Sequence, residues 1–116
     1  MAEFVEAVKK DELKDGTMKS VNIAGRDILI ARVEDTYYAA DNQCPHMGGK
    51  LSRGKLSGTV VTCPLHGSQF DLRNGQVIRW TNFTGFLLKV SNIIKACKPI
   101  TTYNTKTIDE TVNVEI

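Results

Sequence analysis

The chain has 116 residues, of which 41% are hydrophobic and 24% are charged, and its formal net charge is +2. This length suits a single domain with one modest core. The small net charge argues against a nucleic-acid-binding protein, which would carry a stronger basic stripe. No apolar run is long enough to cross a bilayer, which argues against a membrane protein. Residues 1–6 lack both a basic leader and an apolar h-region, so we predict a cytoplasmic location.

The first part of the chain predicts short strands separated by polar turns. Alternating or β-branched apolar residues predict strands over residues 4–8, 17–24, 28–31 and 37–40. Polar turns are predicted at residues 9–16, at Gly25-Arg26 and at residues 34–36. Asp41-Asn42-Gln43 then leads out of the last of these strands.

The second part predicts more strands and one helix. Residues 50–58 are predicted to be a loop and residues 59–62 a strand, and the Asn74-Gly75 pair predicts a hairpin between strands at 69–72 and 76–80. Apolar residues at helical spacing predict a short helix within residues 84–98, ending before Pro99. Residues 99–103 and 111–116 are predicted to form a closing pair of strands. The predicted class is therefore all-β.

Two short arms carry the residues that could bind metal. Cys44-Pro45-His46 and Cys63-Pro64-Leu65-His66 each hold one thiol and one imidazole, and they use both histidines of the chain. Two thiolates and two imidazoles complete a tetrahedral zinc site, so a structural zinc site is one hypothesis. Zinc sites, however, usually group like ligands on one arm, whereas each arm here is mixed. Mixed arms favour a centre with two unlike metal positions, and a [2Fe–2S] cluster offers them.

The pattern resembles the Rieske family of iron–sulfur proteins. Its basis is Cys-x-His, sixteen intervening residues and Cys-x-x-His, followed by Gly67-Ser68-Gln69-Phe70-Asp71. The resemblance implies one domain over residues 1–116, an antiparallel β sandwich or barrel. Residues 1–40 and 80–116 would form its base, with an inserted cluster-binding subdomain at 41–79. Small family members cover the cluster with a proline-bearing loop, but this chain has no proline between Pro64 and Pro99.

The resemblance also implies roles for single residues. Cys44 and Cys63 would hold one iron and His46 and His66 the other, and Ser68 would donate a hydrogen bond to a sulfur of the cluster. High-potential family members also have a tyrosine and a disulfide between the two loops. Here Phe70 stands at the tyrosine position, and Gly49 and Leu65 at the disulfide positions. A ferredoxin is therefore expected, with a potential in the lower part of the Rieske range of roughly −150 to +300 mV. We expect the third cysteine, Cys97, to be a core residue.

We predict a one-electron carrier, not an enzyme, that passes electrons from a reductase to an oxygenase or another terminal oxidoreductase. The arms are surrounded in sequence by basic residues that could steer an acidic redox partner or could simply solubilise the protein. These residues are Lys50, Arg53, Lys55, Arg73 and Arg79. Neither nucleic acid nor a membrane is expected as a partner. The alternatives are a small subunit of a larger redox enzyme, of the nitrite reductase type, and a zinc-stabilised binding module.

Overall fold

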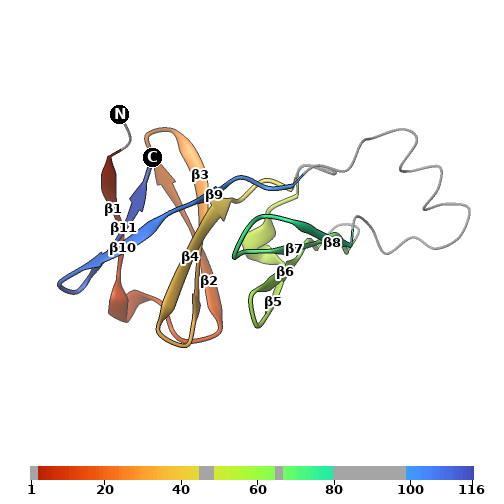
Figure 1. Ribbon diagram of the computed structural model, residues 1–116, viewed down its shortest axis with the longest axis horizontal. Helices are drawn as coiled ribbons and strands as arrows, with labels where there is room; N and C mark the ends of the chain where they lie inside the picture. The colour runs from red at the N-terminus through yellow and green to blue at the C-terminus, as the bar shows by residue number, and fades with distance from the viewer. Residues whose placement is uncertain (1–2, 45–48, 65–66, 80–98) are drawn as a thin grey trace, which may run out of the picture.

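The computed structural model describes residues 3–44, 49–64, 67–79 and 99–116. Along these residues the chain forms eleven strands in three antiparallel sheets, with two short 3₁₀ helices (Figure 1). This confirms the predicted all-β class. No helix among these residues is long and apolar enough to span a membrane. The helix predicted within residues 84–98 lies outside the described residues, and so does Cys97.

The strands of the two sheets of the base come from both ends of the chain. These strands are β1 (Phe4–Lys9), β2 (Thr17–Ile23), β3 (Arg26–Val33), β4 (Thr36–Asp41), β9 (Thr102–Tyr103), β10 (Thr105–Ile108) and β11 (Thr111–Glu115). One sheet has the order β1-β11-β10 and the other the order β2-β3-β4-β9. The 3₁₀ helix η1 (Lys10–Glu12) follows β1.

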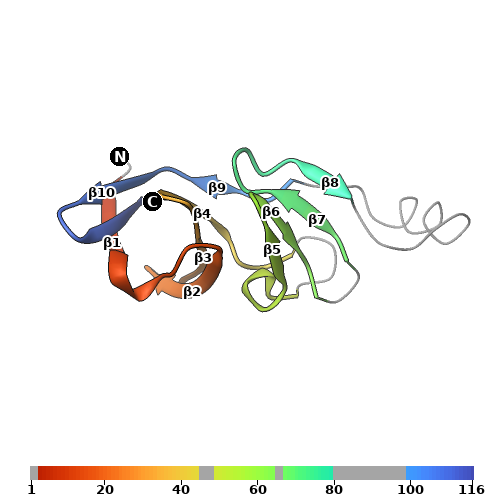
Figure 2. The ribbon, with the colours of Figure 1, turned by 90° about the horizontal axis from the view of Figure 1, so that it is seen from below.

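The third sheet is built from the middle of the chain. Its strands are β5 (Lys55–Ser57), β6 (Val60–Thr62), β7 (Gln69–Asp71) and β8 (Val77–Arg79), in the order β5-β6-β7-β8, and η2 (Leu51–Arg53) precedes them. Figures 1 and 2 show this sheet at one end of the described chain, while β1, β10 and β11 lie at the other end. The sheet that contains β3 and β4 lies between them.

The central strand β3 contributes to two separate cores. Ile28 and Ile30 pack in a cluster with Val8, Val112 and Val114 from the first sheet. Their neighbours Leu29 and Ala31 belong to a second cluster, which also contains buried residues of the third sheet. Successive side chains of a strand point to opposite faces, so a strand covered on both sides must be apolar at every position. This explains why residues 28–31 form an uninterrupted apolar run.

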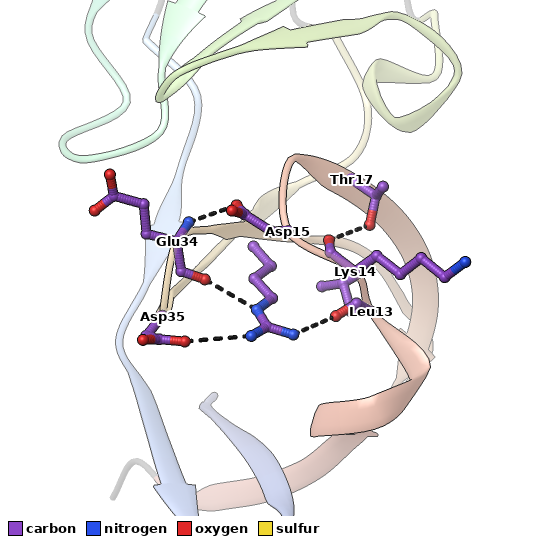
Figure 3. A network of polar contacts seen from close by, with 7 residues as sticks. Leu13, Lys14, Asp15, Thr17, Glu34 and Asp35 are labelled. Carbon is purple, nitrogen blue, oxygen red and sulfur yellow. Dashed lines mark hydrogen bonds and ion pairs between the residues drawn. The ribbon is translucent and has the colours of Figure 1, made fainter.

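A polar network joins two connections of the base. The Arg32 guanidinium donates hydrogen bonds to the carbonyls of Leu13 and Glu34, at 3.0 and 2.9 Å, and it pairs with Asp35 at 3.2 Å. The Asp15 carboxylate accepts a hydrogen bond from the Glu34 N–H at 2.6 Å (Figure 3). These contacts tie the connection between β1 and β2 to the turn between β3 and β4.

Most predicted strands are confirmed, and two predictions are wrong. The hairpin around Asn74-Gly75 is present, since β7 and β8 pair across it. Residues 50–58 are not simply a loop, because they contain η2 and β5. The predicted closing strands do not pair with each other: β9 pairs with β4, whereas β11 pairs with β1 and with β10, a strand that was not predicted. The short strands β5 and β10 exist through pairing with a neighbour, which local composition does not reveal.

Candidate metal centre

The first arm follows β4, and its residues 43–44 lie beside residues 49–50. The Cys44 N–H donates to the Gly49 carbonyl at 2.7 Å, and Gln43 and Lys50 form an isolated antiparallel bridge. The Cys44 side chain is buried, with 1% of its surface exposed. Residues 45–48, including His46, lie outside the described residues. These contacts therefore fix the backbone of Cys44 where the first arm begins.

A buried asparagine holds the two ends of this arm together. The Asn42 side chain accepts a hydrogen bond from the Ser52 N–H at 2.7 Å and donates one to the Asp27 carboxylate at 3.1 Å. The backbone carbonyl of Asn42 accepts from the Leu51 N–H at 2.7 Å. Asn42 is 1% exposed, and sequence reasoning missed its role because it placed the residue only in the segment that leads out of the strand. Its burial had no signal in the sequence.

Asp27 links the hydrogen bonds of Asn42 to the base. Its carboxylate forms an ion pair with Lys50, and its backbone carbonyl accepts from the Asn42 N–H at 3.0 Å. The hydrogen bond from Lys50, with a smaller contribution from Asn42, lowers the pKa of Asp27 although partial burial opposes the shift. Asp27 is therefore a charged acceptor near pH 7 that receives bonds from two residues flanking the first arm.

The second arm connects β6 to β7. The Cys63 N–H donates to the Ser68 carbonyl at 2.7 Å, and the Gly67 N–H donates to the Cys63 carbonyl at 3.1 Å. Gly67 has a φ of +72°, in the left-handed region that favours glycine. Cys63 is 2% exposed and Ser68 is fully buried. Residues 65–66, including His66, lie outside the described residues.

The two cysteines belong to the same buried cluster, although they come from different arms. The cluster also contains Leu51 from η2 and Phe70 from β7, next to the base residues already described. Two thiols in one buried cluster suit a soft metal centre that prefers sulfur ligands. Among the described residues, no group of three or more potential ligands is gathered, and both histidines lie outside this part of the chain.

The segment between the arms packs directly against the second arm. A Cβ atom placed on Gly54 would lie 1.8 Å from the carbonyl oxygen of Thr62 and 3.2 Å from Cδ of Pro64. Only glycine allows this approach, since real Cβ atoms do not come so close to a backbone oxygen. Gly54 therefore lets η2 and β5 support the chain on both sides of Cys63, and the sequence analysis did not single it out.

The hairpin after the second arm is fixed by an ion pair and by contact with the returning chain. Asp71 is buried, and hydrogen bonds from Arg73 hold its pKa at about 2. The Gly75 carbonyl accepts from the Ile100 N–H at 3.0 Å, and a Cβ on Gly75 would lie 2.1 Å from the Ile100 carbonyl oxygen. The turn between β7 and β8 therefore lies against the chain that enters β9.

The structure distinguishes the basic residues near the arms. Lys50 is paired with Asp27, and Arg73 is paired with Asp71 at 2.8 Å. Arg53 and Lys55 are exposed. The fifth residue, Arg79, is the last residue of β8.

A small all-β domain that brings cysteines from two arms into one buried cluster has the arrangement of a metal-binding protein. A family model, the Rieske [2Fe-2S] domain, matches residues 3–99. The ferredoxin component of the naphthalene 1,2-dioxygenase system of Pseudomonas putida is 33% identical over 75 residues, which are 65% of this chain and 72% of that protein. The ferredoxin CarAc of Metapseudomonas resinovorans is 37% identical over 73 residues, covering 62% of this chain and 68% of the relative.

A solved structure supports the fold. The ferredoxin of carbazole 1,9a-dioxygenase from Nocardioides aromaticivorans IC177 matches with a TM-score of 0.77 and 24% identity, over 96% of this chain and 95% of that chain. The chain belongs to the Rieske [2Fe-2S] domain family. Its cofactor is accordingly one [2Fe–2S] cluster and not the zinc ion that the ligand count had left open.

Proposed function

We propose that this chain is a one-electron carrier whose cluster is held by Cys44, His46, Cys63 and His66. The observation that carries the proposal is the meeting of Cys44 and Cys63, from two separate hairpins, in one buried cluster of side chains. The two cysteines would bind one iron as thiolates, and the two histidines would bind the other iron. When bound, a cluster of this type supplies reversible one-electron oxidation and reduction.

The residues of the chain would set the conditions for that chemistry. Leu51 and Phe70 share a buried cluster with both cysteines, and the low dielectric of this core strengthens the effect of every charge and dipole nearby. We propose that the buried Ser68 orients a hydrogen bond toward a cluster sulfur, which would favour the reduced form. Backbone hydrogen bonds in both arms hold Cys44 and Cys63 in place, as a site that changes charge requires.

We further propose a cytoplasmic carrier that accepts electrons from a reductase and passes them to a terminal oxygenase. The relatives support this role, because the one from Pseudomonas putida is the ferredoxin component of a dioxygenase system and CarAc is a ferredoxin. We also propose the division into a base, residues 1–40 and 80–116, and a cluster-binding part, residues 41–79. The separate sheet of β5 to β8 supports this division.

Metal analysis of single-ligand variants tests the proposed function. Purified protein should contain two irons and two acid-labile sulfides per chain and should show the reddish-brown spectrum of a Rieske centre. Cys44→Ala, His46→Ala, Cys63→Ala and His66→Ala should each lose the cluster, because each iron has only two protein ligands. Cys97→Ser is the control and should keep it. A ligand variant with full iron content and an unchanged spectrum would remove that residue from the site.

A further inference from the structure

The described chain is electrically polarised between its two ends. Its residues between 49 and 79 contain five lysines and arginines and one aspartate, a formal charge of +4. The described residues of the base, 3–44 and 99–116, contain seven basic and twelve acidic residues, a formal charge of −5. The sheet of β5 to β8 lies at one end of the described chain (Figure 2), so the positive end is the end that carries the second arm.

Two of the basic residues at this end are neutralised by neighbours. Lys50 is paired with Asp27, and Arg73 is paired with the buried Asp71. Arg53 and Lys55 are exposed, and neither takes part in an ion pair among the described residues. The charge that is available to a partner at this end therefore includes these two side chains.

The backbone fixes both cations beside the second arm. Gly54, which separates them, approaches the Thr62 carbonyl so closely that a Cβ atom would lie 1.8 Å from its oxygen. Lys55 is also the register partner of Thr62 in the pairing of β5 with β6. Since Thr62 immediately precedes Cys63, Arg53 and Lys55 lie next to the strand end that carries a proposed ligand.

We propose that Arg53 and Lys55 form a docking patch that binds an acidic surface of the protein that exchanges electrons with this chain. The inference rests on the proposed carrier function and names the chemistry of its partner. A positive end and a negative base orient the molecule during encounter, so that the arm approaches an acidic surface first. Lys55 is in the edge strand β5, where a charged side chain discourages strand pairing between molecules. That alternative role would be served by a charge of either sign, and it would not require Arg53.

Electron transfer to two haem proteins of opposite charge tests the patch. The reduced protein is mixed with the acidic cytochrome b5 or the basic cytochrome c, and the second-order rate constant is measured against ionic strength. With cytochrome b5 the rate constant should fall as salt rises. The double variant Arg53→Glu/Lys55→Glu should react about tenfold more slowly with cytochrome b5 at low salt, and the difference should vanish at high salt. The double variant should react faster than the parent with cytochrome c.

A matched control changes the same net charge on the base. Lys14 and Lys106 are exposed there, and Lys14→Glu/Lys106→Glu should leave the rate with cytochrome b5 within about twofold of the parent. Equal slowing by both double variants would show that only total charge matters and would overturn the patch. No slowing by the Arg53/Lys55 variant would also overturn it.

A binding measurement tests the docking patch independently of the carrier function. The dissociation constant of the oxidised protein and cytochrome b5, measured by titration at low salt, requires no electron transfer. It should rise about tenfold in the Arg53/Lys55 variant and stay unchanged in the control. If the parent binds in this way but transfers no electron, the proposed carrier function fails, whereas the binding of an acidic surface by Arg53 and Lys55 stands. Unchanged binding in the Arg53/Lys55 variant refutes the patch.

Discussion

Replacing Asn42 by alanine should strongly destabilise the protein, because this side chain closes the first arm. The substitution removes the bond to the Ser52 N–H at 2.7 Å and the bond to the Asp27 carboxylate at 3.1 Å. A hydrogen bond to a neutral partner contributes about 1 kcal/mol net, and one to a charged partner about 1.5–3 kcal/mol. Because Asn42 is 1% exposed, water cannot easily replace either bond, so we expect a loss of about 2–4 kcal/mol. For a domain of this size the melting temperature should fall by about 10 °C.

The assay is thermal unfolding followed by circular dichroism, with cluster absorbance recorded in the same scan. Asn22→Ala is the matched control, because the exposed Asn22 also accepts a backbone hydrogen bond, from the Gly25 N–H at 3.2 Å, but at a turn of the base. Its cost should stay near 0.5–1 kcal/mol. In Asn42→Ala the cluster absorbance should also bleach at a lower temperature than in the control. If the two variants melt within about 2 °C of each other, Asn42 does not clamp the arm and the reasoning is refuted.

Two further predictions follow from single contacts. Gly54→Ala should cost at least about 2–3 kcal/mol in chemical denaturation and lower the iron content, because its Cβ would collide with the Thr62 carbonyl. Gly58→Ala, at a φ of +57° with open space around the new Cβ, should cost only about 1–2 kcal/mol, and equal costs would contradict the proposed contact. Asp71 has a folded-state pKa of about 2, below the ordinary 3.8, so its ion pair with Arg73 stabilises the fold above about pH 4 and this contribution is lost as the pH falls toward 2. Between pH 4 and pH 2 the free energy of unfolding should therefore fall less in Asp71→Asn than in the parent, by about 1–2 kcal/mol once the exposure of Arg73 is considered. An equal fall in both proteins would contradict the assignment.

Sequence alone predicts best those features that a short motif or a local turn signal indicates. The positions of Cys44 and Cys63 on two arms that leave strand ends follow from the motif and from the apolar runs before it, and the structure has both arms there. The Asn74-Gly75 turn was predictable for a local reason, because Gly75 adopts a φ of +78° that few other residues tolerate. Local rules of this kind need no knowledge of the rest of the fold.

The residues that sequence reasoning missed depend on contacts between distant segments. Gly54 looks like an ordinary loop glycine until β6 is placed beside it. The strand β10 was missed because its hairpin turns at Asp109-Glu110, which lacks the glycine of the strongest turn signals. Lys50 and Arg73 looked equivalent to Arg53 and Lys55 in sequence, and only their ion pairs with Asp27 and Asp71 distinguish them.

Strand β3 joins these observations, because it serves the base and the metal centre at once. Leu29 and Ala31 face the cluster of side chains that contains both cysteines, while Ile28 and Ile30 face the opposite core. The residue before this apolar run is Asp27, which binds both Asn42 and Lys50 at the two ends of the first arm. Strand β3 thus supplies apolar residues to the cluster that contains both cysteines, and the charged acceptor Asp27 that holds the first arm. Rigid support of this kind is what a centre needs if its ligands are to keep their geometry when its charge changes.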